Sequence, residues 1–419
     1  MDAAHPIDAG STAWMLASSA LVLLMVPGLA LFYGGLVRPK NVLSTMMHSF
    51  LAMAVIGVHW VLIGYCLSCG TGVDGVAGII GFDPALIGLH GLDHTKLYAD
   101  KGVPELVFVM FQGKFAIITP ALMSGALAER LNLRGYLVFI VVWSTIIYCP
   151  LAHMVWASDG WLFQLGVLDF AGGTVVHIAA GISALVLAVK IGPRREITLG
   201  GSMELTPNSL PLTLLGAGLL WFGWFGFNAG SAVAVESPVA GTAAGLAFAT
   251  TQAAAASAGL TWMLVERLHR KKATSLGLAS GLLAGLVVIT PAAGHVSPAS
   301  ALVMGALASI VCYVAVQVKN ASRVDDTLDA FAVHGVGGIV GALLVGVSCF
   351  TPAAGLIHGD ITQLGKQAVG VVFTLVFAGG GTLIIATIVD KLVGLRVSDA
   401  EEIAGLDVSA HGERAYHHA

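Results

Sequence analysis

The sequence predicts an all-α polytopic membrane protein. Of its 419 residues, 57% are hydrophobic and only 11% are charged, and the mean hydropathy is +0.87. A soluble domain of this length has too small a core for so much apolar surface, whereas helices of about 20 apolar residues can leave that surface in lipid. The apolar residues also fall into separate runs of this length. The 53 glycines favour close packing between such helices.

We predict eleven transmembrane helices from these runs. Most lysines and arginines follow the odd-numbered runs, so they gather on one side of the membrane. Because positive residues stay in the cytoplasm, we expect the N-terminus outside, the C-terminus in the cytoplasm and no cleaved signal peptide. The expected location is the inner (cytoplasmic) membrane. The predicted spans are residues 12–36, 42–69, 104–128, 135–155, 170–190, 209–231, 238–264, 274–293, 299–318, 330–350 and 366–390.

The chain divides into a transmembrane domain, residues 1–391, and a mixed, charged tail, residues 392–419, expected in the cytoplasm. The longest predicted connection, residues 71–103, lies outside and carries Asp74, Asp83, Asp93 and Asp100. The net charge of −4 says little about partners, and the absence of a long basic stretch argues against nucleic acid. All five cysteines lie in apolar runs, where a thiol behaves as a small hydrophobe. Redox or metal chemistry at the Cys66-x-x-Cys69 pair is the alternative.

Two similar stretches place histidines inside predicted membrane helices. Residues 168–181 read LDFAGGTVVHIAAG and residues 328–341 read LDAFAVHGVGGIVG, which puts His177 and His334 at matching positions. Spans 1–5 and 6–10 each end in such a helix. Because five is odd, the halves must be oppositely oriented, as in transporters built from inverted repeats. We expect the two histidines to meet near the middle of the membrane.

Ionisable groups inside a membrane are costly and mark functional sites. Two neutral imidazoles bonded to each other could line a path for a small polar solute or relay a proton. Hydrogen bonds that merely join helices, and ligation of a metal or haem, are the alternatives. Asp169 is expected to cap its helix, or to add negative potential where a cation arrives. Asp329 is expected to occupy the mirrored place in the second half.

Aromatic residues predict an outer site for a cation. Topology sends Trp156 and the end of span 6, with Phe227 and Ser231, toward the outer surface, and Phe115 belongs to another aromatic segment. A ring face attracts a desolvated cation and a hydroxyl accepts its hydrogen bond. Together they describe a cation-recruiting vestibule above a histidine-lined apolar pore. Interfacial aromatic belts are the alternative interpretation.

Several segments, in order and nearly from end to end, resemble the ammonium transporter (Amt/Mep/Rh) family, on its bacterial Amt branch. The Rh-like gas-channel interpretation is weaker because the Amt-type aromatic and serine pattern is present. The segments are PGLALFYGGLVRPKNVLS (27–44), FQGKFAIITPALMSGALAER (111–130), HMVWASDGW (153–161), LDFAGGTVVHIAAG (168–181), WFGWFGFNAGSA (221–232), RVDDTLDAFAVHGVGGIVG (323–341) and VGLRVSDAEEIAGLDVSAHGERAY (393–416).

The resemblance implies roles for individual residues. Phe115, Trp156 and Ser231 match the outer site that recruits ammonium, or methylammonium as its analogue. Phe115 and Phe227 match the stacked phenyl rings that close the pore below that site. Asp169 matches an acidic residue near the recruitment site.

His177 and His334 match the pair of histidines that lines the family's pore. The implied mechanism is that NH4+ binds outside and loses its proton, and that NH3 then crosses, with or without separate proton transfer. The resemblance also implies a homotrimer with one pore per subunit, and a regulatory tail that couples to a cytoplasmic PII-type protein. Lys114 departs from the family pattern, but it lies about 100° round the helix from Phe115 and is expected to face elsewhere.

We therefore expect a transporter for nitrogen uptake, and neither an enzyme nor a protein that needs a cofactor or metal. An ammonium receptor that binds without appreciable flux is the alternative function. A membrane enzyme with a histidine-bound metal is a third.

Overall fold

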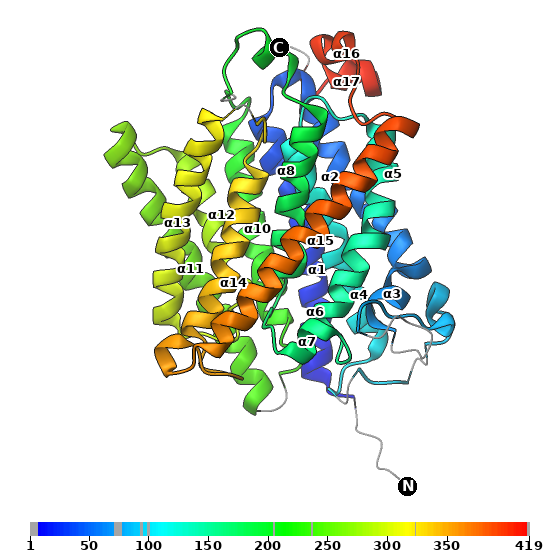
Figure 1. The fold of residues 1–419 in the computed structure, drawn as a ribbon, viewed down its shortest axis with the longest axis vertical. Helices are drawn as coiled ribbons and strands as arrows, with labels where there is room; N and C mark the ends of the chain where they lie inside the picture. Colours follow the sequence, from blue (N-terminus) through cyan, green and yellow to red (C-terminus); the bar gives the residue numbers. More distant parts are fainter. Residues whose placement is uncertain are drawn as a thin grey trace.

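The protein is a bundle of helices that run roughly along one direction (Figure 1). The computed structural model describes residues 7–70, 78–92, 95–98, 101–203, 206–235, 238–322 and 324–416. Within these residues there are helices and two isolated β-bridges but no strand, so the all-α prediction is confirmed. Asp74, Asp93 and Asp100 of the long predicted outer loop, and Arg323 near the second histidine motif, lie outside the described residues.

A helix occupies each of the eleven predicted ranges, and several of these helices are interrupted by 3-10 or π-helical turns. Among the described residues, nine stretches are long and apolar enough to cross a membrane. The count of eleven spans remains a prediction, because α12 has only 15 residues and α11 is not among the nine. In order the helices are α1 Ala9–Leu36, α2 Val42–His59 with α3 Tyr65–Cys69, α4 Glu105–Met123, α5 Leu133–Trp143 with α6 Cys149–Trp156 and α7 Trp161–Leu165, α8 Ala179–Ile191, α9 Arg195–Thr198, α10 Leu210–Gly230, α11 Pro238–Arg270, α12 Ser275–Ile289, α13 Pro298–Ala321, α14 Val336–Ser348, α15 Thr362–Leu392, α16 Asp399–Ala404 and α17 Leu406–His411.

Glycines let the helices approach closely enough to form a continuous core. A Cβ atom at Gly216 of α10 would lie 2.3 Å from the backbone nitrogen of Phe32 in α1, so only glycine allows these two helices to pack as they do. A Cβ at Gly181 of α8 would lie 2.2 Å from the backbone nitrogen of Gly335. This second contact joins the helices that carry the two histidines, as small residues commonly do between membrane helices.

The two ends of the bundle differ. We call the end that carries α16 and α17 the tail side; in Figure 1 these two short helices lie at the top, while α1 begins at the bottom. Two reciprocal contacts, each from a side chain to a backbone N–H, are among those that fasten the tail. Asn41, which precedes α2, accepts a hydrogen bond from the N–H of Leu406 at 2.8 Å, and Asp407 accepts one from the N–H of Ser44 in α2 at 2.8 Å. Each helix thus receives a cap from the other.

Candidate functional site

Asp169 fixes the start of the first histidine helix. Its buried carboxylate accepts backbone hydrogen bonds, and its side chain does not line either of the two cavities described below. The predicted capping role therefore agrees with the geometry, because N–H groups at the start of a helix have no partner within it. The four donors are the amides of Gly172 (2.9 Å), Gly173 (2.6 Å), Thr174 (2.8 Å) and Val175 (3.0 Å).

In the second histidine helix the capping residue is Asp326. Its two carboxylate oxygens accept from the N–H groups of Ala330 at 2.9 Å and Phe331 at 2.8 Å. The prediction that Asp329 mirrors Asp169 is therefore wrong. The spacing shows why: Asp169 and Asp326 each precede their histidine by eight residues, whereas Asp329 precedes His334 by five.

Both histidines lie in π-helical turns just after these caps, in Gly173–Ile178 and Phe331–Gly335. Such turns are rare and are frequently found at functional sites. The two imidazole rings are nearly parallel, with 16° between their planes, and their Nδ1 atoms are 3.2 Å apart. The expected meeting of His177 and His334 thus holds, across 157 residues of sequence. Within the described part of the chain, no three His, Cys, Asp or Glu side chains gather closely enough to hold a metal ion, so the rings have no such third ligand beside them.

One hydrogen bond between two Nδ1 atoms constrains the protons of the pair. One Nδ1 must donate and the other must accept, so in the neutral pair one Nε2 is a bare acceptor and the other carries a proton. The Nε2 atom of His177 is buried and has no hydrogen-bond partner among the described residues. The pair therefore offers both a donor and an acceptor to a small molecule.

A continuous series of rings leads to the histidines. Trp156 meets Phe115 edge-on at 6.0 Å between centroids, and Phe115 stacks on Phe227 at 4.2 Å and 29°. Phe227 in turn lies 6.1 Å from the ring of His177. Trp224, one turn before Phe227 on α10, stacks on His177 at 5.4 Å and 16°. The sequence contains Trp224 in the segment WFGWFGFNAGSA (221–232) but assigns it no role. Its contact with the imidazole follows from how α10 packs against the first histidine helix.

Two cavities lie on either side of the stacked phenyl rings. The outer cavity, of about 610 Å³, is lined by Phe115, Trp156 and Ser231 among others. The tail-side cavity, of about 190 Å³, is lined by Phe227 and by both histidines. Since Phe115 and Phe227 are both essentially inaccessible to solvent, their stacked rings separate the two cavities.

Local hydrogen bonds orient the polar groups of the outer cavity. The indole Nε1 of Trp156 donates to the backbone carbonyl of Asp169 at 2.9 Å, which holds the ring beside the first histidine helix. The hydroxyl of Ser231 donates to the carbonyl of Phe227 at 2.9 Å, so its lone pairs remain available as acceptors. Lys114 does not line either cavity, as expected from its position on α4.

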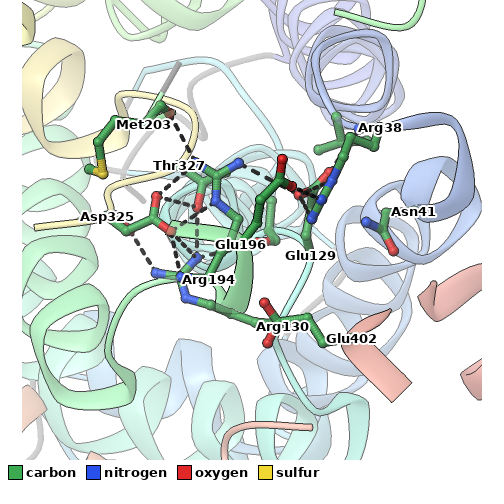
Figure 2. Close-up of polar contacts among 12 residues, drawn as sticks. Arg38, Asn41, Glu129, Arg130, Arg194, Glu196, Met203, Asp325, Thr327 and Glu402 are labelled. Carbon is green, nitrogen blue, oxygen red and sulfur yellow. Dashed lines mark hydrogen bonds and ion pairs between the residues drawn. The ribbon is translucent and has the colours of Figure 1, made fainter. Parts of the chain in front are cut away.

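On the tail side, buried charges from distant segments form an ionic cluster (Figure 2). Arg194 binds Asp325 through its backbone N–H and its Nε, both at 2.8 Å, and Arg130 donates to the carbonyl of Asp325 at 2.6 Å. Glu129 accepts from the backbone N–H and the Nε of Arg38, both at 2.8 Å. In the sequence these arginines indicate only the orientation of the chain, because nothing in the sequence pairs segments so far apart.

The acidic members of this cluster are held ionised. Burial alone would raise the pKa of the Asp325 carboxyl, but the guanidinium groups of Arg130 and Arg194 outweigh burial and lower that pKa below its usual value. Burial likewise opposes ionisation of Glu129, and its bonds to Arg38 lower its pKa overall. A charged group without these partners would be strongly destabilising in such a site.

The fold and site define a polytopic membrane protein with two cavities separated by stacked phenyl rings, the tail-side one of which is lined by a buried pair of imidazoles. The sequence model of the Ammonium Transporter Family matches residues 13–416. The chain belongs to this family of membrane transporters, as its sequence motifs predicted.

Relatives match over nearly their full length. An ammonium transporter of Bacillus subtilis is 43% identical over 97% of this chain and 98% of its own, and the ammonium transporter Amt1 of Archaeoglobus fulgidus is 43% identical over 97% and 99%. The crystal structure of Saccharomyces cerevisiae Mep2 covers 94% of this chain and 88% of its own, with 36% identity and a TM-score of 0.85. A solved sensor Amt protein covers 96% and 98%, with 30% identity and a TM-score of 0.85.

Proposed function

We propose that the protein recruits NH4+ in the outer cavity, that the cation gives its proton to water on the outer side of the stacked phenyl rings, and that NH3 is conducted past the two histidines. The proton then either returns to the outer solution or crosses separately through the imidazole pair. The observation that carries this proposal is the uninterrupted series of rings from Trp156 through Phe115 and Phe227 to His177 and His334. It joins two cavities through a zone whose described side chains are apolar rings and imidazoles that can stay neutral. A bare cation is strongly disfavoured in such a zone.

The outer cavity suits a small cation. The faces of Trp156 and Phe115 supply negative electrostatic potential, and Ser231 supplies a hydroxyl oxygen as acceptor. Ammonium can donate to that oxygen while its other hydrogens face the rings. Potassium has a similar charge but cannot lose a proton, so it would stop at the phenyl rings.

The histidine pair suits the neutral product. Ammonia is both a donor and an acceptor, and the pair presents one nitrogen of each kind. The stacking of Trp224 on His177, and the bond from the Trp224 Nε1 to Thr290 at 2.9 Å, hold the imidazole in place. The same pair could also pass a proton between its nitrogens, which would make transport electrogenic.

Uptake of labelled methylammonium into proteoliposomes tests the proposal. We expect His177→Ala to abolish selective uptake or to admit potassium, because the pore loses its hydrogen-bonding groups. Phe227→Ala should raise leakage of potassium, because it joins the two cavities. The matched control is Phe222→Ala, which changes an exposed phenylalanine on the same helix and should transport normally. Selective uptake that is unchanged in both His177→Ala and Phe227→Ala would contradict the pore assignment.

A sensor is the second candidate function, because a solved sensor Amt protein shares the fold. In a sensor, ammonium would bind in the outer cavity without appreciable flux, and the tail would report the binding. The uptake measurement separates the two functions: saturable binding of methylammonium without uptake favours the sensor.

We further propose that the protein acts as a homotrimer in the cytoplasmic membrane, with the tail side facing the cytoplasm. The clustering of arginines on that side supports this orientation. The docked α16 and α17 would then be available to a PII-type regulatory protein. Native mass spectrometry of the protein in lipid, and binding of a purified PII-type protein before and after removal of residues 392–419, test these assignments.

A further inference from the structure

An ion pair lies at the tail-side mouth of the pore. The Lys319 Nζ is 2.7 Å from Oδ1 of Asp329 and donates to the backbone carbonyl of Asp326 at 3.1 Å. Both Lys319 and Asp329 line the cavity that reaches His177 and His334. The lysine side chain is only 10% exposed, so its ammonium group is held in place rather than free in solvent.

The repeat shows what is unusual about this pair. The residue three positions after the cap is Gly172 in the first half and Asp329 in the second, and both have a left-handed backbone, with φ of 111° and 59°. A Cβ atom at Gly172 would lie 3.6 Å from the Trp156 ring, which belongs to the outer cation site. Asp329 therefore occupies the tail-side counterpart of a position beside the outer site. At this position the side chain is the carboxylate of Asp329 on the tail side and the hydrogen atom of Gly172 on the outer side.

A carboxylate at this mouth would by itself attract cations. The same cavity is also lined by Glu266, whose oxygens accept bonds from the N–H (2.8 Å) and the hydroxyl (3.0 Å) of Thr274, and by the cation Arg270. The carboxylate of Asp329 is instead neutralised by Lys319, whose group R–NH3+ has the chemistry of methylammonium itself.

We propose that Lys319 is a tethered cation that neutralises Asp329, and so prevents the tail-side mouth from binding ammonium as the outer mouth does. This inference rests on the proposed function. In the wild-type protein the outer site binds the cation through rings and a hydroxyl, while the tail-side mouth releases product without retaining it. Lys319 thus sets the affinity of one face and leaves the other unchanged. Lys319 does not alter the ammonium gradient across the membrane at equilibrium, because a passive pathway cannot create a gradient.

The test is the initial rate of labelled methylammonium entry into right-side-out and inside-out membrane vesicles, which gives a half-saturating concentration for each face. Lys319→Met should lower that concentration at the tail face about fivefold, the effect of one unit charge about 4 Å away in water. The outer-face value should stay unchanged, which also shows that the variant is folded. Lys319→Arg is the matched control and should resemble wild type.

Asp329→Asn gives a second, opposite test. Asparagine tolerates the left-handed backbone and leaves Lys319 unneutralised, so the half-saturating concentration at the tail face should rise. The double variant Lys319→Met with Asp329→Asn should return close to wild type. An unchanged tail-face value in both single variants, or equal shifts at both faces, would overturn the inference while leaving the proposed function intact. Wild-type vesicles without saturable entry from either face would overturn both.

Discussion

Replacing Asp169 distinguishes two roles that the sequence left open. Its carboxylate accepts four buried backbone bonds of 2.6–3.0 Å. Leaving a buried N–H unsatisfied costs about 1–3 kcal/mol, so Asp169→Ala should destabilise the protein by about 4 kcal/mol or more. Asp169→Asn keeps one oxygen and turns an NH2 group toward two donors, so it should cost about 2 kcal/mol or more. Asp169→Glu keeps the charge but places the carboxylate one methylene further from the backbone.

Thermal unfolding of the purified protein in detergent, together with the half-saturating concentration for methylammonium, provides the assay. If the residue is a cap, Asp169→Glu should be destabilised much as Asp169→Asn is. Asp83→Ala is the matched control, since Asp83 caps an exposed turn with one bond to Ala85 at 3.0 Å and should cost less than about 1 kcal/mol. If Asp169→Asn unfolds like wild type but binds methylammonium poorly, and Asp169→Glu behaves normally in both, the capping argument is refuted and negative potential is the role.

Two further predictions concern the tail side. The pKa of Asp325 is lowered in the folded protein, so its contribution to stability is present above the pKa of the unfolded chain, near 4, and is lost as the pH falls through the lower folded value. The variant Asp325→Asn should therefore be destabilised at pH 7 and should lose this part of the acid dependence. Thermal unfolding between pH 3 and 7 measures both effects. Asp407→Ala removes the cap on the N–H of Ser44, which costs about 1 kcal/mol, so cleavage of the tail in limited proteolysis should increase about fivefold. Ser409→Ala is the control: its hydroxyl bonds only within the tail, so this variant should leave cleavage unchanged.

The sequence predicted those features that depend on residues close together along the chain. Apolar runs located the helices because a lipid-exposed helix must be apolar along its length. The matched positions of His177 and His334 predicted their meeting, because an inverted repeat brings equivalent positions to one axis. The error over Asp329 came from aligning the two stretches on the Leu-Asp with which each begins, which pairs Asp169 with Asp329. The spacing of eight residues, visible in the sequence, identifies Asp326 as the cap.

Other features depend on packing that the sequence does not encode in one place. The stacking of Trp224 on His177 requires α10 and the first histidine helix to lie at a particular separation and rotation. The contact between Gly181 and Gly335 sets the distance between the histidine helices, yet neither glycine differs in sequence from the many others. The bond from Arg130 to Asp325 joins residues 195 positions apart, so no local pattern could indicate it.

Both ends of the pathway pair fixed charges that line their cavities. The outer cavity has rings and a hydroxyl in the positions argued to bind the cation, and two charged residues of its lining, Lys96 and Glu105, pair with each other at 3.1 Å. The tail side likewise holds full charges that are matched by partners, as Arg194 is by Asp325 and Lys319 by Asp329. Rings attract a cation without needing to be neutralised themselves, so the outer site can release its ligand readily. A fixed carboxylate at the tail side would hold the cation unless a partner compensates its charge. Of the two tail-side pairs, only Lys319 and Asp329 line the cavity, so this is the pair that we propose to serve conduction, because compensation keeps the tail-side mouth from becoming a trap.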